Sequence, residues 1–132
     1  MDNKATDPLV GTSKTVTTVV DGSNTAAAVG SGSLDVFSTP MMVALMEQAA
    51  CMCLVLDEGQ TSVGTAVAVE HVAASLPGTT ISATATITGV QGRKIEFAVS
   101  AHDVMGTIGS GTHARFIVDS AKFIKKAGAN RA

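Results

Sequence analysis

Apolar residues fill one long stretch of the chain and alternate with polar residues through most of the sequence after it. From Pro40 to Leu56 the sequence reads PMMVALMEQAACMCLVL, in which Glu47 is the one charged residue. Such a run predicts a helix buried on every side, about 25 Å long at about 1.5 Å per residue. Ser38 or Thr39, followed by proline, predicts its start, and Gly59 predicts its end near residues 57–59.

Strand patterns lie on both sides of this run. Residues 12–20 are rich in β-branched side chains, while residues 21–33 are rich in Gly, Ser and Ala and predict a loop with a short strand near 26–29. After the helix, alternation with a period of two predicts four strands joined by short turns, at residues 63–72, 80–88, 94–101 and 107–118. Four successive strands of this kind predict an antiparallel meander.

One buried helix and a meander together predict an α+β fold, in which a curved antiparallel sheet wraps around a central helix. A single sheet covers only part of such a helix, so we expect a second copy of the chain to complete its burial. At 132 residues the chain is long enough for one domain, 1–132, with frayed ends at 1–8 and about 124–132. Without Trp or Tyr, the core must be aliphatic.

Charge is distributed unevenly. The chain carries a net charge of −2, but residues 93–132 hold seven of the nine basic side chains and three acids, which leaves −6 on the first 92 residues. A local basic cluster suits a small phosphorylated ligand. It is too sparse and too poor in aromatic residues for a nucleic-acid platform, so we expect no nucleic-acid partner.

The cysteines and the N-terminus predict a cytoplasmic protein. Cys51 and Cys53 lie two residues apart on the helix, point to different sides, and are expected to be small buried thiols in a reducing compartment. The N-terminus has no apolar signal core. The central run is slightly short for a membrane span and contains Glu47 and Gln48, so we expect no membrane partner.

Four residues are candidates for chemistry. A lone acid on a buried helix, Glu47, is either a structural ion pair or a reactive group with a tuned pKa. His71 closes a strand and is either a core residue or a catalytic one. Thr39 is either a helix N-cap or a hydroxyl near a reacting carbonyl. Gly64 marks a bulge or a close approach to the backbone.

Polar residues of the later strands offer weaker candidates. His113 lies two residues before Arg115 and shares its strand face; we interpret His113 as structural and His102 as a surface residue. No nucleotide fingerprint, metal-ligand spacing or nucleophile elbow appears, so no cofactor or metal is expected.

Four motifs in order resemble one bacterial family. FSTPMMVALMEQAA, SVGTAVAVEHVAASLPG, GRKIEFAVSAHD and IGSGTHARFIV, between about Val36 and Val118, resemble the hot-dog-fold thioesterases that include the fluoroacetyl-CoA-specific thioesterase. The resemblance implies a hot-dog homodimer that hydrolyses acyl-CoA thioesters without a metal. It leaves open whether dimers pair into tetramers.

The resemblance also implies roles for particular residues. Thr39, Glu47 and His71 fall on the family's catalytic threonine, glutamate and histidine. Gly64 matches the glycine whose backbone N–H helps to bind the thioester carbonyl, and Arg115 matches an arginine near the substrate. Glu47 would either attack the carbonyl or activate a water, and the sequence does not choose between these.

Other positions concern the rest of the substrate. Arg93, Lys94 and the C-terminal lysines are candidates for binding the CoA phosphates, remote from the reacting carbon. The sequence departs from the fluoroacetyl-specific pattern at Ser33, where an aromatic residue would cover the acyl pocket, and at Pro40, where glycine follows the threonine. We therefore expect a more open pocket.

Two other functions compete with hydrolysis. The first is a non-catalytic module that holds acyl-CoA or another small ligand. The second is a hot-dog hydratase or dehydratase, which needs an Asp/His pair beside the β-carbon. His102 and Asp103 are the one adjacent pair, and their predicted turn position fits that chemistry poorly.

Overall fold

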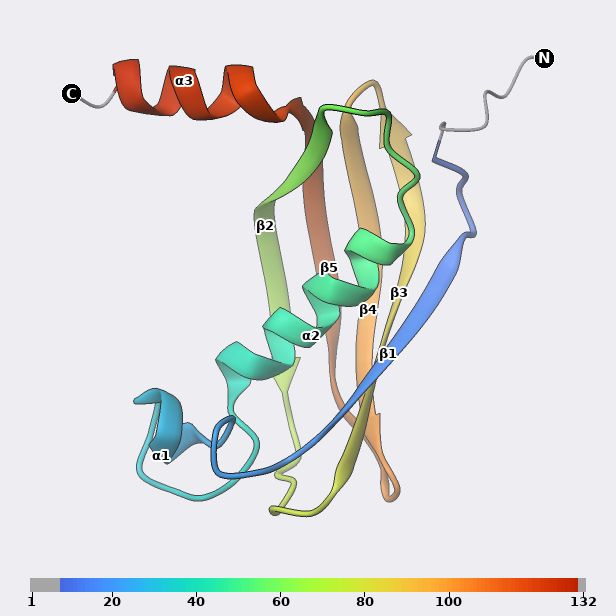
Figure 1. Ribbon diagram of the computed structural model, residues 1–132. Helices are drawn as coiled ribbons and strands as arrows, with labels where there is room; N and C mark the ends of the chain where they lie inside the picture. The colour runs from blue at the N-terminus through green and yellow to red at the C-terminus, as the bar shows by residue number, and fades with distance from the viewer. Residues whose placement is uncertain (1–7, 131–132) are drawn as a thin grey trace.

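The protein forms a five-stranded antiparallel sheet that curves around one long helix, as seen in a computed structural model that describes residues 8–130 (Figure 1). In chain order the elements are β1 (Ser13–Val19), α1 (Ala26–Val29), α2 (Thr39–Met52), β2 (Gln60–His71), β3 (Thr80–Gln91), β4 (Lys94–Asp103), β5 (Gly106–Asp119) and α3 (Ser120–Asn130). The predicted α+β fold, with a sheet around a central helix, is confirmed.

The strand order in the sheet is β1-β3-β4-β5-β2. The predicted meander is right for β3, β4 and β5 and wrong for β2, which pairs with β5 instead of β3. The physical reason is the length of the connection between β2 and β3. Eight residues, 72–79, separate the two strands, which is more than a hairpin needs and allows the chain to cross to another part of the sheet.

Helix α2 packs its buried residues on the concave face of the sheet. The side chains buried in α2 are Met42, Leu45, Met46, Ala49 and Ala50. They meet aliphatic residues and Phe97 of β3 and β4. The expectation of burial on every side is wrong for the single chain, because Pro40, Ala44, Gln48 and Met52 form an exposed stripe with a spacing of four.

The boundaries of α2 follow from local hydrogen bonds. Ser38 is the N-cap, since its hydroxyl accepts from the backbone N–H of Met41 at 3.2 Å. The helix ends at Met52, with Cys53 as its C-cap, several residues before the predicted stop at 57–59. Cys53 is buried, as expected, but Cys51 is exposed because it faces away from the sheet.

Two further segments differ from the prediction. Residues 26–29 form helix α1 instead of a strand, because Thr25 caps the alanine-rich turn and Gly30 ends it in the left-handed conformation, at φ 78°. The C-terminal part, expected to fray from about residue 124, is helical through Asn130. The rest of the predicted frayed ends, 1–7 and 131–132, lies outside the described residues. None of the helices within 8–130 is long and apolar enough to cross a membrane.

Candidate active site

Thr39 and His71 meet where α2 begins and β2 ends. Because Ser38 caps the helix, the hydroxyl of Thr39 is free for another partner, and its Oγ1 lies 2.8 Å from Nδ1 of His71. The other ring nitrogen, Nε2, is buried and has no hydrogen-bond partner among the described residues. A buried polar atom without a partner is costly, so it marks a place where a ligand or another chain would bind.

Burial also sets the protonation of this histidine. It lowers the pKa of His71 below its ordinary value, because charging the imidazole away from water is unfavourable, and the backbone of Ala73 opposes the shift. A lowered pKa keeps the ring neutral near pH 7, so one ring nitrogen remains an acceptor. The pair of Thr39 and His71 can therefore hold or move a proton at the hydroxyl.

The pair lines a hollow of about 320 Å³. Its remaining walls come from α1, the chain just before α2, and the segment after β2, and they are small or apolar: Ala26, Ser31, Val36, Phe37, Ser38, Val72, Ala73 and Ala74. Two backbone hydrogen bonds hold these walls together. The N–H of Phe37 donates to the carbonyl of Ser75 at 2.9 Å, and the N–H of Val72 donates to the carbonyl of Ile108 at 2.7 Å. The hollow has the size and the polarity to hold a short acyl group.

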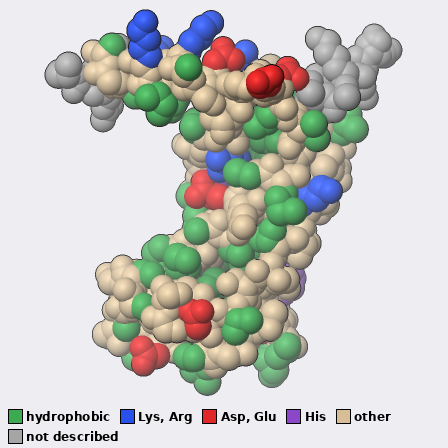
Figure 2. All heavy atoms as spheres, in the orientation of Figure 1, with side chains coloured by type: hydrophobic (Ala, Val, Ile, Leu, Met, Phe, Trp, Pro, Cys, Tyr) green, Lys and Arg blue, Asp and Glu red, His purple; other side chains and the backbone are tan. Residues whose placement is uncertain are grey.

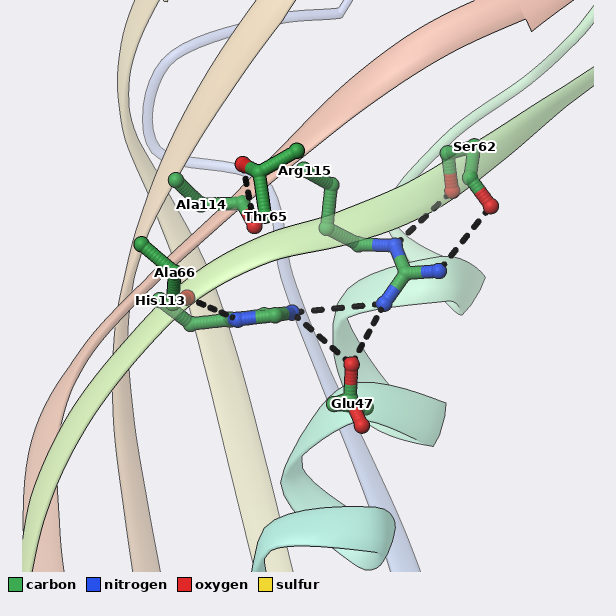
Figure 3. Close-up of polar contacts among 7 residues, drawn as sticks. All are labelled: Glu47, Ser62, Thr65, Ala66, His113, Ala114 and Arg115. Atoms are coloured by element: carbon green, nitrogen blue, oxygen red, sulfur yellow. Dashed lines mark hydrogen bonds and ion pairs between the residues drawn. The ribbon is translucent and has the colours of Figure 1, made fainter. Parts of the chain in front are cut away.

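Glu47 lies two turns further along α2 and has different neighbours (Figure 3). Its Oε2 accepts a hydrogen bond from Nη1 of Arg115 at 3.1 Å. The Arg115 side chain is 8% exposed, whereas that of Glu47 is 40% exposed. The other oxygen, Oε1, has no hydrogen-bond partner within residues 8–130 and points away from the arginine (Figure 3).

Arg115 is held in place by the backbone and side chain of Ser62. Its Nε donates to Oγ of Ser62 at 2.8 Å and its Nη2 donates to the Ser62 carbonyl at 3.0 Å. A buried guanidinium with this many protein acceptors is fixed in one orientation. It therefore positions the carboxylate of Glu47, and its described hydrogen bonds go to groups of its own chain.

His113 completes this cluster from the neighbouring position on the same face of β5. Its Nδ1 lies 2.8 Å from the carbonyl of Ala66, so Nδ1 carries the proton, and Nε2 accepts from Nη1 of Arg115 at 3.3 Å. Burial is the largest cause and lowers the pKa of His113; the hydrogen bond to the Ala66 carbonyl opposes it, the charge of Arg115 lowers the pKa further, and the charge of Glu47 raises it least. The ring is neutral, so its 3.8 Å approach to Glu47 is not an ion pair.

Gly64 is the point at which β2 passes closest to Glu47. Both predicted interpretations hold, since the pairing of β2 with β5 shifts between Gly64 and Ala66, and a Cβ added at Gly64 would overlap Oε2 of Glu47. That Cβ would also lie 3.3 Å from Nη1 of Arg115. Glycine is required here for space, not for an unusual backbone angle.

The structure thus brings the predicted residues together in two groups. Thr39 joins His71, and Glu47 joins Arg115 and Gly64, but no hydrogen bond or ion pair between described residues links the groups within one chain. Thr39 and Glu47 are eight residues apart along α2, which corresponds to about 12 Å. From Gly64 to His71, seven strand residues correspond to about 23 Å.

Arg93 and Lys94 lie in neither group. Arg93 contacts Asp119 at 4.0 Å, and Lys94 contacts Glu96 at 3.7 Å, all near the end of the sheet from which α3 starts. Lys94 also lines a larger hollow of about 630 Å³ with residues of β2, β4 and β5. That hollow contains none of Thr39, Glu47 and His71, so its size alone does not make it the site.

Sequence reasoning missed Ser62 and the part played by His113. The signal for His113 was present, because it shares a strand face with Arg115. Nothing in the sequence marked Ser62, whose role depends on the pairing of β2 with β5. Within residues 8–130, no cluster of three or more His, Cys, Asp or Glu side chains could hold a metal ion.

This fold, with one helix held in the curve of an antiparallel sheet, is that of the hot-dog thioesterases. The sequence profile of the fluoroacetyl-CoA-specific thioesterases, named FlK, matches residues 20–121. The chain therefore belongs to the FlK family of thioester hydrolases, and the predicted resemblance is confirmed.

Individual relatives agree. A fluoroacetyl-CoA thioesterase from Streptantibioticus cattleyicolor is 46% identical over 94 residues, 70% of this chain and 68% of the relative. A crystal structure of a FlK variant in complex with fluoroacetate and CoA is 38% identical with a TM-score of 0.83, covering 87% of this chain and 98% of that one. A hot-dog-like protein from Thermanaerovibrio acidaminovorans is 27% identical with a TM-score of 0.85, covering 93% of each chain.

Proposed function

We propose that this protein hydrolyses short acyl-CoA thioesters at a site made by two copies of the chain. Thr39 and His71 come from one copy, and Glu47, Gly64 and Arg115 from the other. The observation that carries the proposal is the hydrogen bond between Thr39 and His71, two residues that line one hollow, with the second imidazole nitrogen buried and without a partner among the described residues. The fluoroacetyl-CoA relative supports an acyl-CoA as substrate.

The free edge of β2 supports a homodimer. β2 is the last strand of the sheet, is 12 residues long, and is largely exposed and rich in valine and alanine. An apolar edge of this length pairs readily with another strand. A second β2, running antiparallel about a twofold axis, would satisfy its backbone groups and cover the exposed stripe of α2.

Such pairing also brings the two groups of residues together. If the twofold axis passes near Val67, Gly64 of one copy lies opposite Glu70 of the other, next to His71. Glu47 touches Gly64, so its free Oε1 then faces the Thr39 and His71 pair of the second copy. Each dimer contains two such sites, and neither site is complete in one chain.

The chemistry follows from these groups. Glu47 either takes a proton from a water that attacks the thioester carbonyl, or attacks the carbonyl itself and forms an anhydride that water then opens. The Thr39 hydroxyl and the N–H of Gly64 stabilise the negative charge that develops on the carbonyl oxygen. The C–S bond breaks, and His71 guides a proton to the leaving thiolate. The products are a carboxylic acid and free CoA.

The pocket favours a range of short acyl groups. Its walls include Ala26, Ala73 and Ala74, and no aromatic side chain projects from the exposed segment around Ser33. Without a bulky cover from the segment around Ser33, the hollow discriminates weakly between acyl groups that differ by one carbon or one fluorine. We propose comparable kcat/KM values for acetyl, propionyl and fluoroacetyl esters.

We also place the protein in the cytoplasm. The thiols of Cys51 and Cys53 are both free, and free thiols are typical of a reducing compartment. Fractionation of cells that express the tagged full-length chain tests this placement.

The decisive experiment combines two inactive variants. Wild-type protein should release CoA from a panel of short acyl-CoA esters, detected with a thiol reagent, whereas Glu47→Gln and His71→Ala should each lose activity. An equal mixture of the two variants, refolded together, should regain about one quarter of wild-type activity, because half of the dimers are mixed and each has one intact site. No recovery means that the site lies within one chain. Binding of acyl-CoA without turnover by wild type means a binding module.

A further inference from the structure

Within residues 8–130, helix α3 packs on little besides β5, from which it starts. It has 11 residues, its side chains from Ala121 to Ala129 are all exposed, and in Figure 1 it projects from the end of β5 past β2 and away from the sheet. A helix this short is marginal in water unless an apolar face is buried. Phe123 and Ile124 give α3 such a face, 40% and 70% exposed.

The charges of α3 are of one sign. Lys122, Lys125 and Lys126 lie on it, and it contains no acid. Figure 2 shows basic side chains gathered along this helix, which lies at the opposite end of the molecule from α1 (Figure 1). A surface that binds α3 should therefore be both apolar and acidic.

The end of the molecule that holds α1 has these properties. Val29, Leu34 and Val72 are exposed there, and Val72 lines the hollow of Thr39 and His71. Residues 20–38 carry two acids, Asp21 and Asp35, and no base, and Glu70 lies next to His71. This surface complements α3 in both hydrophobicity and charge.

One chain cannot bring the two surfaces together. α3 starts directly after Asp119, which pairs with Gln60 at the beginning of β2, whereas His71 at the other end of β2 pairs with Gly109. Antiparallel pairing of two β2 strands reverses this relation, since the Gln60 end of one copy then lies beside the His71 end of the other. Because α3 projects past β2, it then extends over the partner.

From this geometry, and resting on the dimer of the proposed function, we propose that α3 of one copy docks on the α1 end of its partner. There Phe123 and Ile124 cover Val29, Leu34 and Val72 and complete the wall of the partner's acyl hollow. The lysines of α3 then lie between the acidic residues of that surface and the mouth of the hollow. A thioester with an anionic carrier such as CoA would pass them on its way to His71.

Cross-linking tests the docking without any need for activity. A benzophenone is attached to Ile124→Cys in a Cys51→Ser background, and labelled copies are combined with unlabelled ones into dimers. The probe should form cross-links to residues 26–36 or 72–76 of the unlabelled copy. The same probe at Val10→Cys, an equally exposed apolar position outside α3, should not reach these residues. Cross-links from position 124 that stay within one chain, or that reach other segments, overturn the proposal.

A mixed dimer tests the effect on the site. Phe123→Ser with Ile124→Ser should raise KM for acyl-CoA at least about fivefold, while Leu9→Ser with Val10→Ser leaves it unchanged. A heterodimer of that α3 variant with His71→Ala, purified through two tags, should recover wild-type KM at half the kcat, because its one complete site has an intact α3 from the His71→Ala copy. If α3 acted on its own copy, KM would stay high, which refutes the proposal.

These outcomes separate the two proposals. A wild-type chain that gives the expected cross-links but hydrolyses no acyl-CoA refutes the proposed function and keeps the docking of α3. A hydrolytic dimer without those cross-links refutes the docking and keeps the function.

Discussion

Adding one methyl group at Gly64 tests whether the β2 backbone must pass close to Glu47. The Cβ of Gly64→Ala would overlap Oε2 of Glu47 and lie 3.3 Å from both Nη1 of Arg115 and Cε1 of His113. The strand conformation accepts alanine and keeps its N–H, so neither backbone strain nor a lost donor contributes. The carboxylate, at the end of a flexible side chain, must move away from the arginine.

The energy of that displacement can be bounded from the structure. At 3.1 Å, the Coulomb attraction between Glu47 and Arg115 is about 5 kcal/mol for an effective dielectric constant of about 20, before desolvation is subtracted. Breaking a fully buried pair costs about 3–5 kcal/mol. Because Glu47 is 40% exposed and Arg115 keeps its bonds to Ser62, we expect a loss of about 1–3 kcal/mol in the free energy of unfolding.

The effect on catalysis should be larger than the effect on stability. A misplaced base or nucleophile loses about 10²-fold or more in rate, so kcat of Gly64→Ala should fall by at least that factor. Thiol release from an acyl-CoA gives kcat, and urea unfolding gives stability. The matched control is Gly89→Ala, whose Cβ would lie 3.1 Å from Oε1 of the exposed Glu96, away from the site. It should keep wild-type kcat. If both variants lose activity equally, or neither does, the reasoning is refuted.

Four further outcomes are expected. Thr39→Val should lower kcat about 10²-fold while Thr39→Ser stays within about tenfold of wild type in the thiol-release assay, because serine keeps the hydroxyl. Burial lowers the pKa of His113, so below about pH 6.5 the unfolded state binds more protons than the folded state. Thermal unfolding should therefore show that the folded state loses stability as the pH drops through this range. The loss should be less steep in His113→Asn, which keeps a donor for the carbonyl of Ala66. Val67→Lys should raise the dimer Kd at least about tenfold in sedimentation, since like charges meet near the twofold axis. Lys125→Ala with Lys126→Ala should raise KM for acyl-CoA but not for the matching N-acetylcysteamine thioester, which has no phosphates.

The sequence predicted what depends on local pattern. The period of two along residues 80–88 and 94–101 predicted strands because alternate side chains are buried against α2, as the structure confirms. The apolar run from residue 40 predicted the central helix. The predicted C-terminal end was wrong, since residues 54–56 are as apolar as the helix but not helical: Leu54 and Leu56 pack against the core, and Val55 is exposed. Hydropathy alone cannot distinguish these two environments.

The site could be predicted only in part, because its contacts join residues far apart in sequence. Glu47 was marked by its apolar surroundings, yet its partner Arg115 is 68 residues away and reaches it through the pairing of β5 with β2. The sequence predicted β2 beside β3, and with that order Arg115 would not lie next to Gly64. The order of strands in a sheet is set by tertiary packing, which alternation does not encode.

Under the proposed function, the separation of Thr39 from Glu47 leaves the site incomplete in a single chain. Both residues lie on α2, so no change of side-chain rotamer can close a gap of about 12 Å. Bending α2 would break the packing of Met42, Met46 and Ala49 against the sheet. The twofold axis of the proposed dimer, beside β2, would close the gap without bending α2, because it would place the middle of one copy next to the end of the other. The free edge of β2, the exposed stripe of α2 and the unpacked α3 are then three parts of one surface, and catalysis should depend on protein concentration in the range where the dimer dissociates.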